Sequence, residues 1–277
     1  MWITRLIAAS FFIAAGCSAH AETLRIGGTG VSLGGMRIMG EAFEKQNPGV
    51  TVEVLPSLGS TGGARALAAG ALDLSMTSRP LKDEEAAKGL SATPYATTQL
   101  AIATSADTRT DGITTQQLAD MYAGRVQNWP TGERVRLVLR PQSESDVAIL
   151  RGLSDEMAAA VDAAFERPGL VLATNDQDNA DTLERLPGSL GAIAVGQIAT
   201  EGRRLKVLKL DGVLPTSATD DPAAADREAE RRSKAFAKTL YLIQPAEMSA
   251  TAEAFLTFVY SPAGQSILAA HDHTPVR

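Results

Sequence analysis

The chain has 277 residues, a formal net charge of −6 and a hydrophobic content of 44%. That length is enough for one large domain or for two lobes that each bury a core. The acidic balance and an aromatic content of only 5% argue against a nucleic-acid partner. Cys17 is the only cysteine, which excludes an internal disulfide and a thiolate metal site.

The first 21 residues have the composition of a secretory signal peptide. One basic residue precedes an apolar run over residues 6–16, and small residues follow in Ala19-His20-Ala21. This run is shorter than the ~20 residues that span a bilayer, and no later apolar run approaches that length. We expect cleavage after Ala21 and a periplasmic location. The alternative is lipoprotein processing at Cys17, because residues 14–17 form a degenerate lipobox.

Strands and helices alternate along the rest of the chain. Apolar runs predict strands at residues 24–26, 51–55, 71–76, 99–105, 135–139, 169–174, 191–195, 205–210 and 239–243. Helical spacing and capping residues predict helices around residues 36–43, 62–70, 82–88, 114–122, 147–153, 180–186, 249–260 and from 261 onward. Residues 221–234 are charged and predict an exposed helix or a linker. This alternation is typical of the α/β class with mostly parallel sheets.

Two hydroxyl-bearing turns, in the segment from Gly59 to Pro80, carry the first functional signal. Each turn follows a predicted strand and opens a helix, which is where an open α/β sheet binds ligands. Ser60, Thr61 and Ser78 offer neutral donors there, and Arg79 lies beside them. Free backbone N–H groups and the helix dipole favour an anion at such turns, so the pattern predicts an oxyanion site.

The same arrangement returns later with an arginine. The strand at residues 135–139 ends on Arg140, and the polar turn Gln142-Ser143-Glu144-Ser145-Asp146 precedes the next helix. A guanidinium can hold two oxygens of an anion with its fork of N–H groups. Arg140 is therefore the strongest single candidate for anion binding.

Several segments, in the same order, resemble those of the periplasmic phosphate-binding proteins that supply ATP-driven phosphate importers. Residues 59–63 are similar to the family's G-S-x-G-G segment, and residues 73–81 to its D-F-x-x-S-D-x-P-L turn. Residues 112–129 resemble its L-x-x-I-F/Y-x-G…N-W segment. Val138-Leu139-Arg140 resembles a strand that ends in a phosphate-contacting arginine, and residues 255–265 resemble the C-terminal F-x-x-F-x-x-S-x-x-G-Q helix pair.

This resemblance implies a two-lobed, venus-flytrap fold of the periplasmic-binding-protein kind. Each lobe would be a mostly parallel sheet flanked by helices, with two crossings near residues 99–105 and 238–243. Residues 22–98 and 238–277 would form one lobe, and residues 99–237 the other. The protein would be a monomer that is not an enzyme and needs no cofactor. It would capture an inorganic oxyanion, in the first place phosphate, and deliver it to the permease of an ABC importer.

The resemblance also implies which residues bind the anion. They are Thr29, Gly30, Ser60, Thr61, Ser78, Arg79, Arg140, Ser143 and Ser145. Two positions depart from the family pattern: Ser78 stands where the family has an aspartate, and residues 143–146 replace its S-G-T. The missing carboxylate would otherwise repel an unprotonated anion. Sulfate and molybdate therefore stay open as alternative ligands.

Other interpretations rest on isolated motifs. Gly30-Val31-Ser32-Leu33-Gly34 matches the G-x-S-x-G pattern of serine hydrolases, for which His271 could supply a base. A signalling protein on the same fold is a further alternative. His271-Asp272-His273 offers too few ligands for a closed zinc site and predicts a solvated tail. Trp129 is expected to pack, and Arg79 either contacts ligand, pairs with Asp146 or is solvated.

Overall fold

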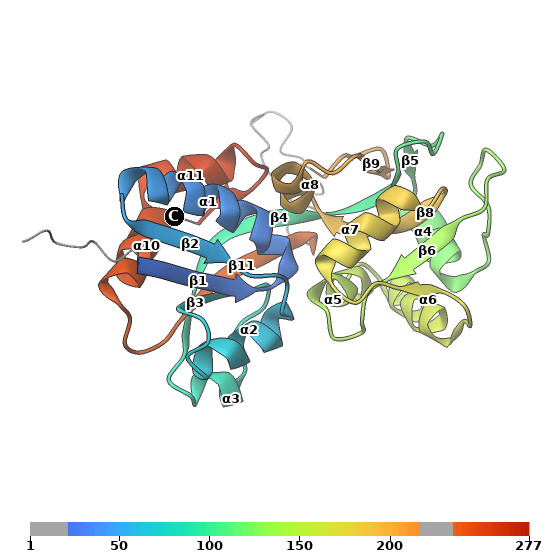
Figure 1. Ribbon diagram of the computed structural model, residues 1–277. Helices are drawn as coiled ribbons and strands as arrows, with labels where there is room; N and C mark the ends of the chain where they lie inside the picture. Colours follow the sequence, from blue (N-terminus) through green and yellow to red (C-terminus); the bar gives the residue numbers. More distant parts are fainter. Residues whose placement is uncertain (1–21, 216–234, 277) are drawn as a thin grey trace, which may run out of the picture.

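The structure, a computed structural model, describes residues 22–215 and 235–276. Two α/β lobes lie side by side, and the long strand β4 (Ser91–Ser105) runs from one into the other (Figure 1). The expected two-lobed α/β architecture is therefore confirmed. The predicted signal peptide, Cys17 and the segment 221–234 lie outside the described residues.

One sheet path passes through both lobes in the order β2-β1-β3-β11-β4-β8-β6-β7. In the first lobe these strands are β2 (Val50–Val54), β1 (Glu22–Gly28), β3 (Leu74–Thr77) and β11 (Ala237–Gln244). In the second lobe they are β8 (Ser189–Ala194), β6 (Arg136–Leu139) and β7 (Val171–Leu172). Three shorter pairings are made by β12 (Thr274–Pro275) and β9 (Leu205–Val207), both on β4, and by β5 (Gly112–Ile113) with β10 (Lys209–Leu210).

Strand direction changes at the centre of this path. β1 pairs in parallel with β2 and β3, and β6 pairs in parallel with β7 and β8. β4 and β11 pair antiparallel with each other and with their outer neighbours. The expected parallel pairing thus holds for the outer strands of each lobe. The central strands differ because β4 leaves the first lobe while β11 returns to it.

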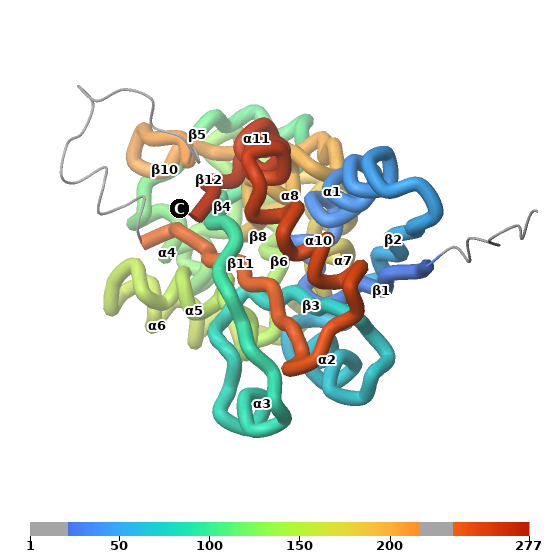
Figure 2. Tube along the Cα trace, turned by 90° about the vertical axis from the view of Figure 1, so that its left-hand side faces the viewer, coloured from blue at the N-terminus to red at the C-terminus, as the bar shows by residue number. Residues whose placement is uncertain are grey.

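The crossing lies within β4 itself. Residues 91–99 of this strand pair with β11, and residues 100–103 pair with β8. Figure 2 shows β11 running alongside β4, as this register requires. The two connections between the lobes are therefore adjacent strands, which makes a compact hinge.

Helices flank the large sheet in each lobe. In the first lobe they are α1 (Leu33–Gln46), α2 (Gly59–Ala68), α3 (Asp83–Ala86), α10 (Ala250–Tyr260) and α11 (Pro262–Ala269), preceded by the short 3-10 turn η1 (Gly30–Ser32). In the second they are α4 (Thr115–Ala123), α5 (Ser145–Arg151), α6 (Asp155–Glu166), α7 (Asp176–Arg185) and α8 (Val195–Glu201). Over the described ranges, none of them combines the length and apolar character needed to span a bilayer.

The predicted caps are present. Thr114 accepts a hydrogen bond from the N–H of Gln117, whose side chain in turn accepts one from the Thr114 N–H, so the capping box is confirmed. Ser261 accepts from the N–H of Gly264, with Pro262 in the first turn of α11. The sequence pattern did not predict α6 or α8.

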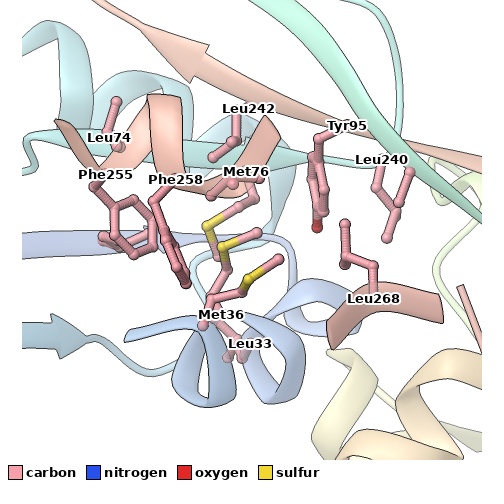
Figure 3. Packing of buried hydrophobic residues seen from close by; sticks show 14 of the residues in the cluster. Leu33, Met36, Leu74, Met76, Tyr95, Leu240, Leu242, Phe255, Phe258 and Leu268 are labelled. Carbon is pink, nitrogen blue, oxygen red and sulfur yellow. The ribbon is translucent and has the colours of Figure 1, made fainter. Parts of the chain in front are cut away.

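Each lobe has a separate hydrophobic core. The first packs α1, α10 and α11 against the sheet, and Figure 3 shows Met36 and Met76 beside Phe255 and Phe258. The ring of Phe255 meets that of Phe43 edge to face, with centroids 5.3 Å apart. In the second core Trp129 is buried and donates to the carbonyl of Gly188, which confirms that it packs.

Candidate functional site

The loops that follow β1, β3 and β6 meet where the two lobes touch. Ser78 follows β3 in the first lobe, and Ser145 opens α5 in the second. Their hydroxyl oxygens lie 3.2 Å apart, within hydrogen-bonding distance across the lobes. The strand-end turns expected to bind an anion therefore face one another.

The first loop is held close to β3 by its backbone. Gly28 has a φ of +139°, and a Cβ there would lie 2.2 Å from the carbonyl oxygen of Met76, so only glycine fits. The N–H of Thr29 donates to that same carbonyl, at 3.0 Å. Thr29 and Gly30 are buried. The next N–H, that of Val31, donates to a carboxylate oxygen of Asp176 in the second lobe, at 3.1 Å.

The second loop joins Ser60 to Ser78. The hydroxyl of Ser60, in the first turn of α2, accepts from the N–H of Ser78 at 3.3 Å. This places two of the predicted donors next to each other. Ser78 is only 8% exposed, so its hydroxyl lies inside the junction of the lobes.

Arg79 makes its hydrogen bonds within the first lobe. Its two terminal nitrogens donate to both carboxylate oxygens of Glu85, at 2.7 and 2.8 Å, and one of them also donates to the hydroxyl of Thr61. These hydrogen bonds lower the pKa of Glu85 and raise that of Arg79. The expected alternative pairing of Arg79 with Asp146 is wrong, because Glu85 is nearer along the chain and binds the guanidinium with both oxygens.

Arg140 is the cation at the centre of the junction. It is 4% exposed. One terminal nitrogen donates to the carbonyl of Ala173 at 2.9 Å, and the other to Asp176 Oδ1 at 3.3 Å. Its Nε is buried without a hydrogen-bond partner among the described residues. A buried guanidinium N–H without a partner is costly, which suits a place where a ligand oxygen is received.

Only part of the polar turn after Arg140 faces the junction of the lobes. Ser145 faces Ser78, whereas Ser143 is exposed in the turn. Glu144 approaches Arg140, with an oxygen 3.6 Å from a terminal nitrogen. Burial raises the pKa of Glu144, and the attraction of Arg140 opposes that rise.

Four charged residues at the junction were not predicted as site residues: Glu144, Asp146, Asp176 and Lys238. Asp146 and Lys238 form a buried ion pair, with Lys238 Nζ 2.5 Å from Asp146 Oδ1. Burial alone would lower the pKa of Lys238, but the carboxylates of Asp146 and Asp176 raise it. Asp176 opens α7 just after β7, so the pattern of strand, polar turn and helix could have identified it. Lys238 is a lone charge within an apolar crossing strand, which is a weaker signal.

The residues of the rival interpretations lie elsewhere. Ser32 is 1% exposed, and its hydroxyl accepts from Tyr95 at 2.9 Å rather than from a histidine. His271, just beyond α11, contacts the carbonyl of Ile267 in that helix. The expectation of a solvated tail is wrong for His273, which is 4% exposed and packs on Gly196 at the start of α8. Over the described ranges, no three His, Cys, Asp or Glu side chains are grouped to hold a metal ion.

Part of the chain is similar in sequence to curated phosphate-binding proteins. A curated relative, the phosphate-binding protein PstS 2 of Streptococcus agalactiae, is 35% identical over 89 residues. That alignment covers 32% of this chain and 30% of the relative, so the chain matches less than a third of the relative's length.

Two solved structures share the fold over nearly the whole chain. One, from Clostridium perfringens, is assigned as a phosphate ABC transporter substrate-binding protein and contains bound phosphate; it has a TM-score of 0.73 and 20% identity, and covers 92% of this chain and 100% of its own. The other, the periplasmic molybdate-binding protein of Azotobacter vinelandii, has a TM-score of 0.64 and 15% identity, with coverages of 92% and 100%. The model of the PBP superfamily domain matches residues 14–263. The chain therefore belongs to the PBP superfamily and has the two-lobed fold of periplasmic binding proteins.

Proposed function

We propose that this protein is an extracytoplasmic solute-binding protein that captures an inorganic oxyanion, in the first place phosphate, between its two lobes. The observation that carries the proposal is Arg140, a buried guanidinium whose Nε has no hydrogen-bond partner among the described residues and lies 4.0 Å from Asp146 Oδ2. It shares the junction with Ser78 and the Val31 backbone of the opposite lobe. Arginine suits this role because its fork matches two oxygens of a tetrahedral anion.

Binding would need no covalent chemistry. The N–H of Val31 and the hydroxyls of Ser60, Ser78 and Ser145 are neutral donors, and Arg140 adds the charge. Closure of the lobes removes water from the anion, which strengthens each of these hydrogen bonds. This account assigns the protein no enzymatic activity and no cofactor, and treats it as a monomer.

The named ligands of the relatives support phosphate without excluding other oxyanions. The curated relative is named for phosphate, and the Clostridium perfringens structure holds it. The Azotobacter vinelandii protein of the same fold is named for molybdate. Delivery to the permease of an ABC transporter is suggested by the Clostridium perfringens protein, which is named as a substrate-binding protein of such a transporter, and would place the chain outside the cytoplasm.

The division into lobes is part of the same proposal. We assign residues 22–98 and 238–277 to the first lobe and 99–237 to the second. The hydrophobic clusters support this division, since the second core is built from residues between Leu100 and Leu208. The first core draws on residues 24–96 and 240–268, with Ala194 added.

Calorimetric titration of the ligand-stripped chain with phosphate, sulfate and molybdate tests the function. Arg140→Ala should weaken binding by about 100-fold or more, because hydrogen bonds to a charged group contribute about 1.5–3 kcal/mol each and tenfold corresponds to about 1.4 kcal/mol. Arg136→Ala is the matched control, since Arg136 is exposed at the start of the same strand. Equal affinity in Arg140→Ala and the wild type would contradict the site, and no binding of any of the three anions would contradict the function.

A further inference from the structure

The carboxylate of Asp176 accepts hydrogen bonds from both lobes at once. Asp176 is 5% exposed at the start of α7. Its Oδ2 accepts from the N–H of Val31 in the first lobe, at 3.1 Å. Its Oδ1 accepts from a terminal nitrogen of Arg140 in the second lobe, at 3.3 Å. These are the same two donors that the proposed oxyanion would require.

The surroundings hold this carboxylate in place. Gln177 donates to the carbonyl of Gly30 at 2.9 Å, and Gln197 donates to the carbonyl of Asp176 at 3.2 Å. A Cβ on Gly30 would lie 2.7 Å from Asp176 Oδ2, so the close approach of α7 to the first loop depends on a glycine there. The contact is therefore built by several residues of both lobes.

The charges at the junction leave little room for a further anion. Arg140 and Lys238 are buried cations that already face Asp146 and Asp176, with Glu144 beside them, and Arg79 is bound to Glu85. An added oxyanion would leave the buried cluster with excess negative charge, which is costly in a low-dielectric interior. Binding becomes favourable if one carboxylate withdraws. Asp146 is bound to Lys238 at 2.5 Å, so Asp176 is the one whose donors the ligand shares.

We propose that Asp176 is an affinity-determining residue that acts as an internal competitor of the oxyanion. In the ligand-free protein its carboxylate bridges Val31 and Arg140 and holds the lobes together, and the ligand displaces it. The predicted effect of Asp176 on ligand affinity rests on the proposed function, whereas its predicted effect on lobe closure is independent of that function. Removing the charge at position 176 therefore has two separate consequences.

The first consequence is tested by titrating Asp176→Asn with phosphate. We expect about tenfold tighter binding than in the wild type, because the ligand no longer displaces a charged competitor. Asp178→Asn is the matched control: Asp178 lies in the same first turn of α7, but its carboxylate accepts from the N–H of Thr174 at 2.8 Å. Its affinity should stay within about threefold of the wild type. Unchanged or weaker binding by Asp176→Asn would overturn the proposal.

The second consequence is tested without ligand, by small-angle X-ray scattering. Asp176→Asn should have a larger radius of gyration than the wild type and Asp178→Asn, and saturating phosphate should remove the difference. Equal radii in the absence of ligand would refute the bridging role. If the wild type binds no oxyanion, the proposed function fails, but the ligand-free scattering still decides whether Asp176 joins the lobes. Asp176→Ser is the second variant to use if the thermal midpoint shows that Asp176→Asn is unfolded.

Discussion

Two buried cations define the junction at the scale of single residues. Arg140 is stabilised by the Ala173 carbonyl and by Asp176, and Lys238 by Asp146. A buried charge is tolerated only when it is paired and hydrogen-bonded. These pairings bring together residues 36 and 92 positions apart in the sequence. Each ion pair therefore links distant parts of the chain.

The Lys238–Asp146 pair leads to a stability prediction. Lys238→Met removes the cation nearest to Asp146 and leaves only Arg140 Nε, 4.0 Å from Asp146 Oδ2, so the free energy of unfolding should fall by about 3 kcal/mol. Lys209→Met is the control, because Lys209 is exposed and its loss should change stability by less than about 0.5 kcal/mol. Denaturant unfolding measures both. Equal stabilities for the two variants would show that the pair is not needed to neutralise Asp146.

The site residues fall into two groups: the position of some is predicted by the local sequence pattern, and that of others depends on the tertiary fold. Ser60 and Ser78 follow strands of the first lobe, whereas Arg140 and Ser145 follow a strand of the second. They come together because β6 and β8 run opposite to the strands of the first lobe, so that the carboxyl ends of the two sets face each other. Local sequence patterns predict that each residue lies at a strand end. The same pattern could have identified Asp176, which opens α7 just after β7, but Lys238 could not be singled out in this way. The environment of Lys238 depends on partners that only the tertiary fold supplies, as does the turning of Arg79 towards Glu85.

At the scale of elements, β4 is a strand that the sequence pattern predicts only in part. Apolar residues predict its second half, residues 99–105, but the strand begins at Ser91. The first half is rich in threonine and contains Pro94, which favours edges and bulges. The structure places a register shift opposite this proline, between Leu240 and Tyr241 of β11. Pairing with β11 thus creates a strand that local propensity would not.

The opposite error occurs at β7. The sequence predicts a strand over residues 169–174, yet only Val171 and Leu172 pair, each with one residue of β6. Both side chains are exposed, so no core contact extends the strand. The starts of α4 and α11 were predicted accurately, because their caps are local interactions.

The capping box of α4 can be tested directly. Thr114→Ala removes the hydroxyl that accepts from the Gln117 N–H, at 3.0 Å, and should lower the free energy of unfolding by about 1 kcal/mol. Thr257→Ala makes the same chemical change within α10, where Thr257 is exposed, and should be neutral or slightly stabilising. A cost in α10 as large as that in α4 would mean that the cap contributes nothing specific.

At the scale of the whole molecule, the C-terminal segment supports the hinge. β12 pairs with β4 at Thr97 and Ala96. The neighbouring Thr98 accepts from the N–H of Gly196 in α8 and donates to the carbonyl of Asp272. His273 packs against Gly196 at the same place. The crossing strand, α8 and the chain end are therefore bound to each other.

This arrangement makes the stability of the hinge dependent on pH. Burial lowers the pKa of His273 below its ordinary value of 6.5. The unfolded chain then binds a proton at a higher pH than the folded one, so stability is lost as pH falls below about 6.5. His273→Gln should lose less stability than the wild type between pH 7.5 and pH 5. Parallel pH profiles of the two thermal midpoints would contradict this role.

The central claim is that a tetrahedral anion binds between the lobes at Arg140. The most direct measurement is a crystal structure of the ligand-stripped chain with arsenate, whose arsenic atom marks its position by anomalous scattering. The account predicts one anomalous peak between Val31, Ser78 and Arg140, with the carboxylate of Asp176 withdrawn from both donors. A peak at another place, or none at arsenate concentrations that saturate binding, would contradict it.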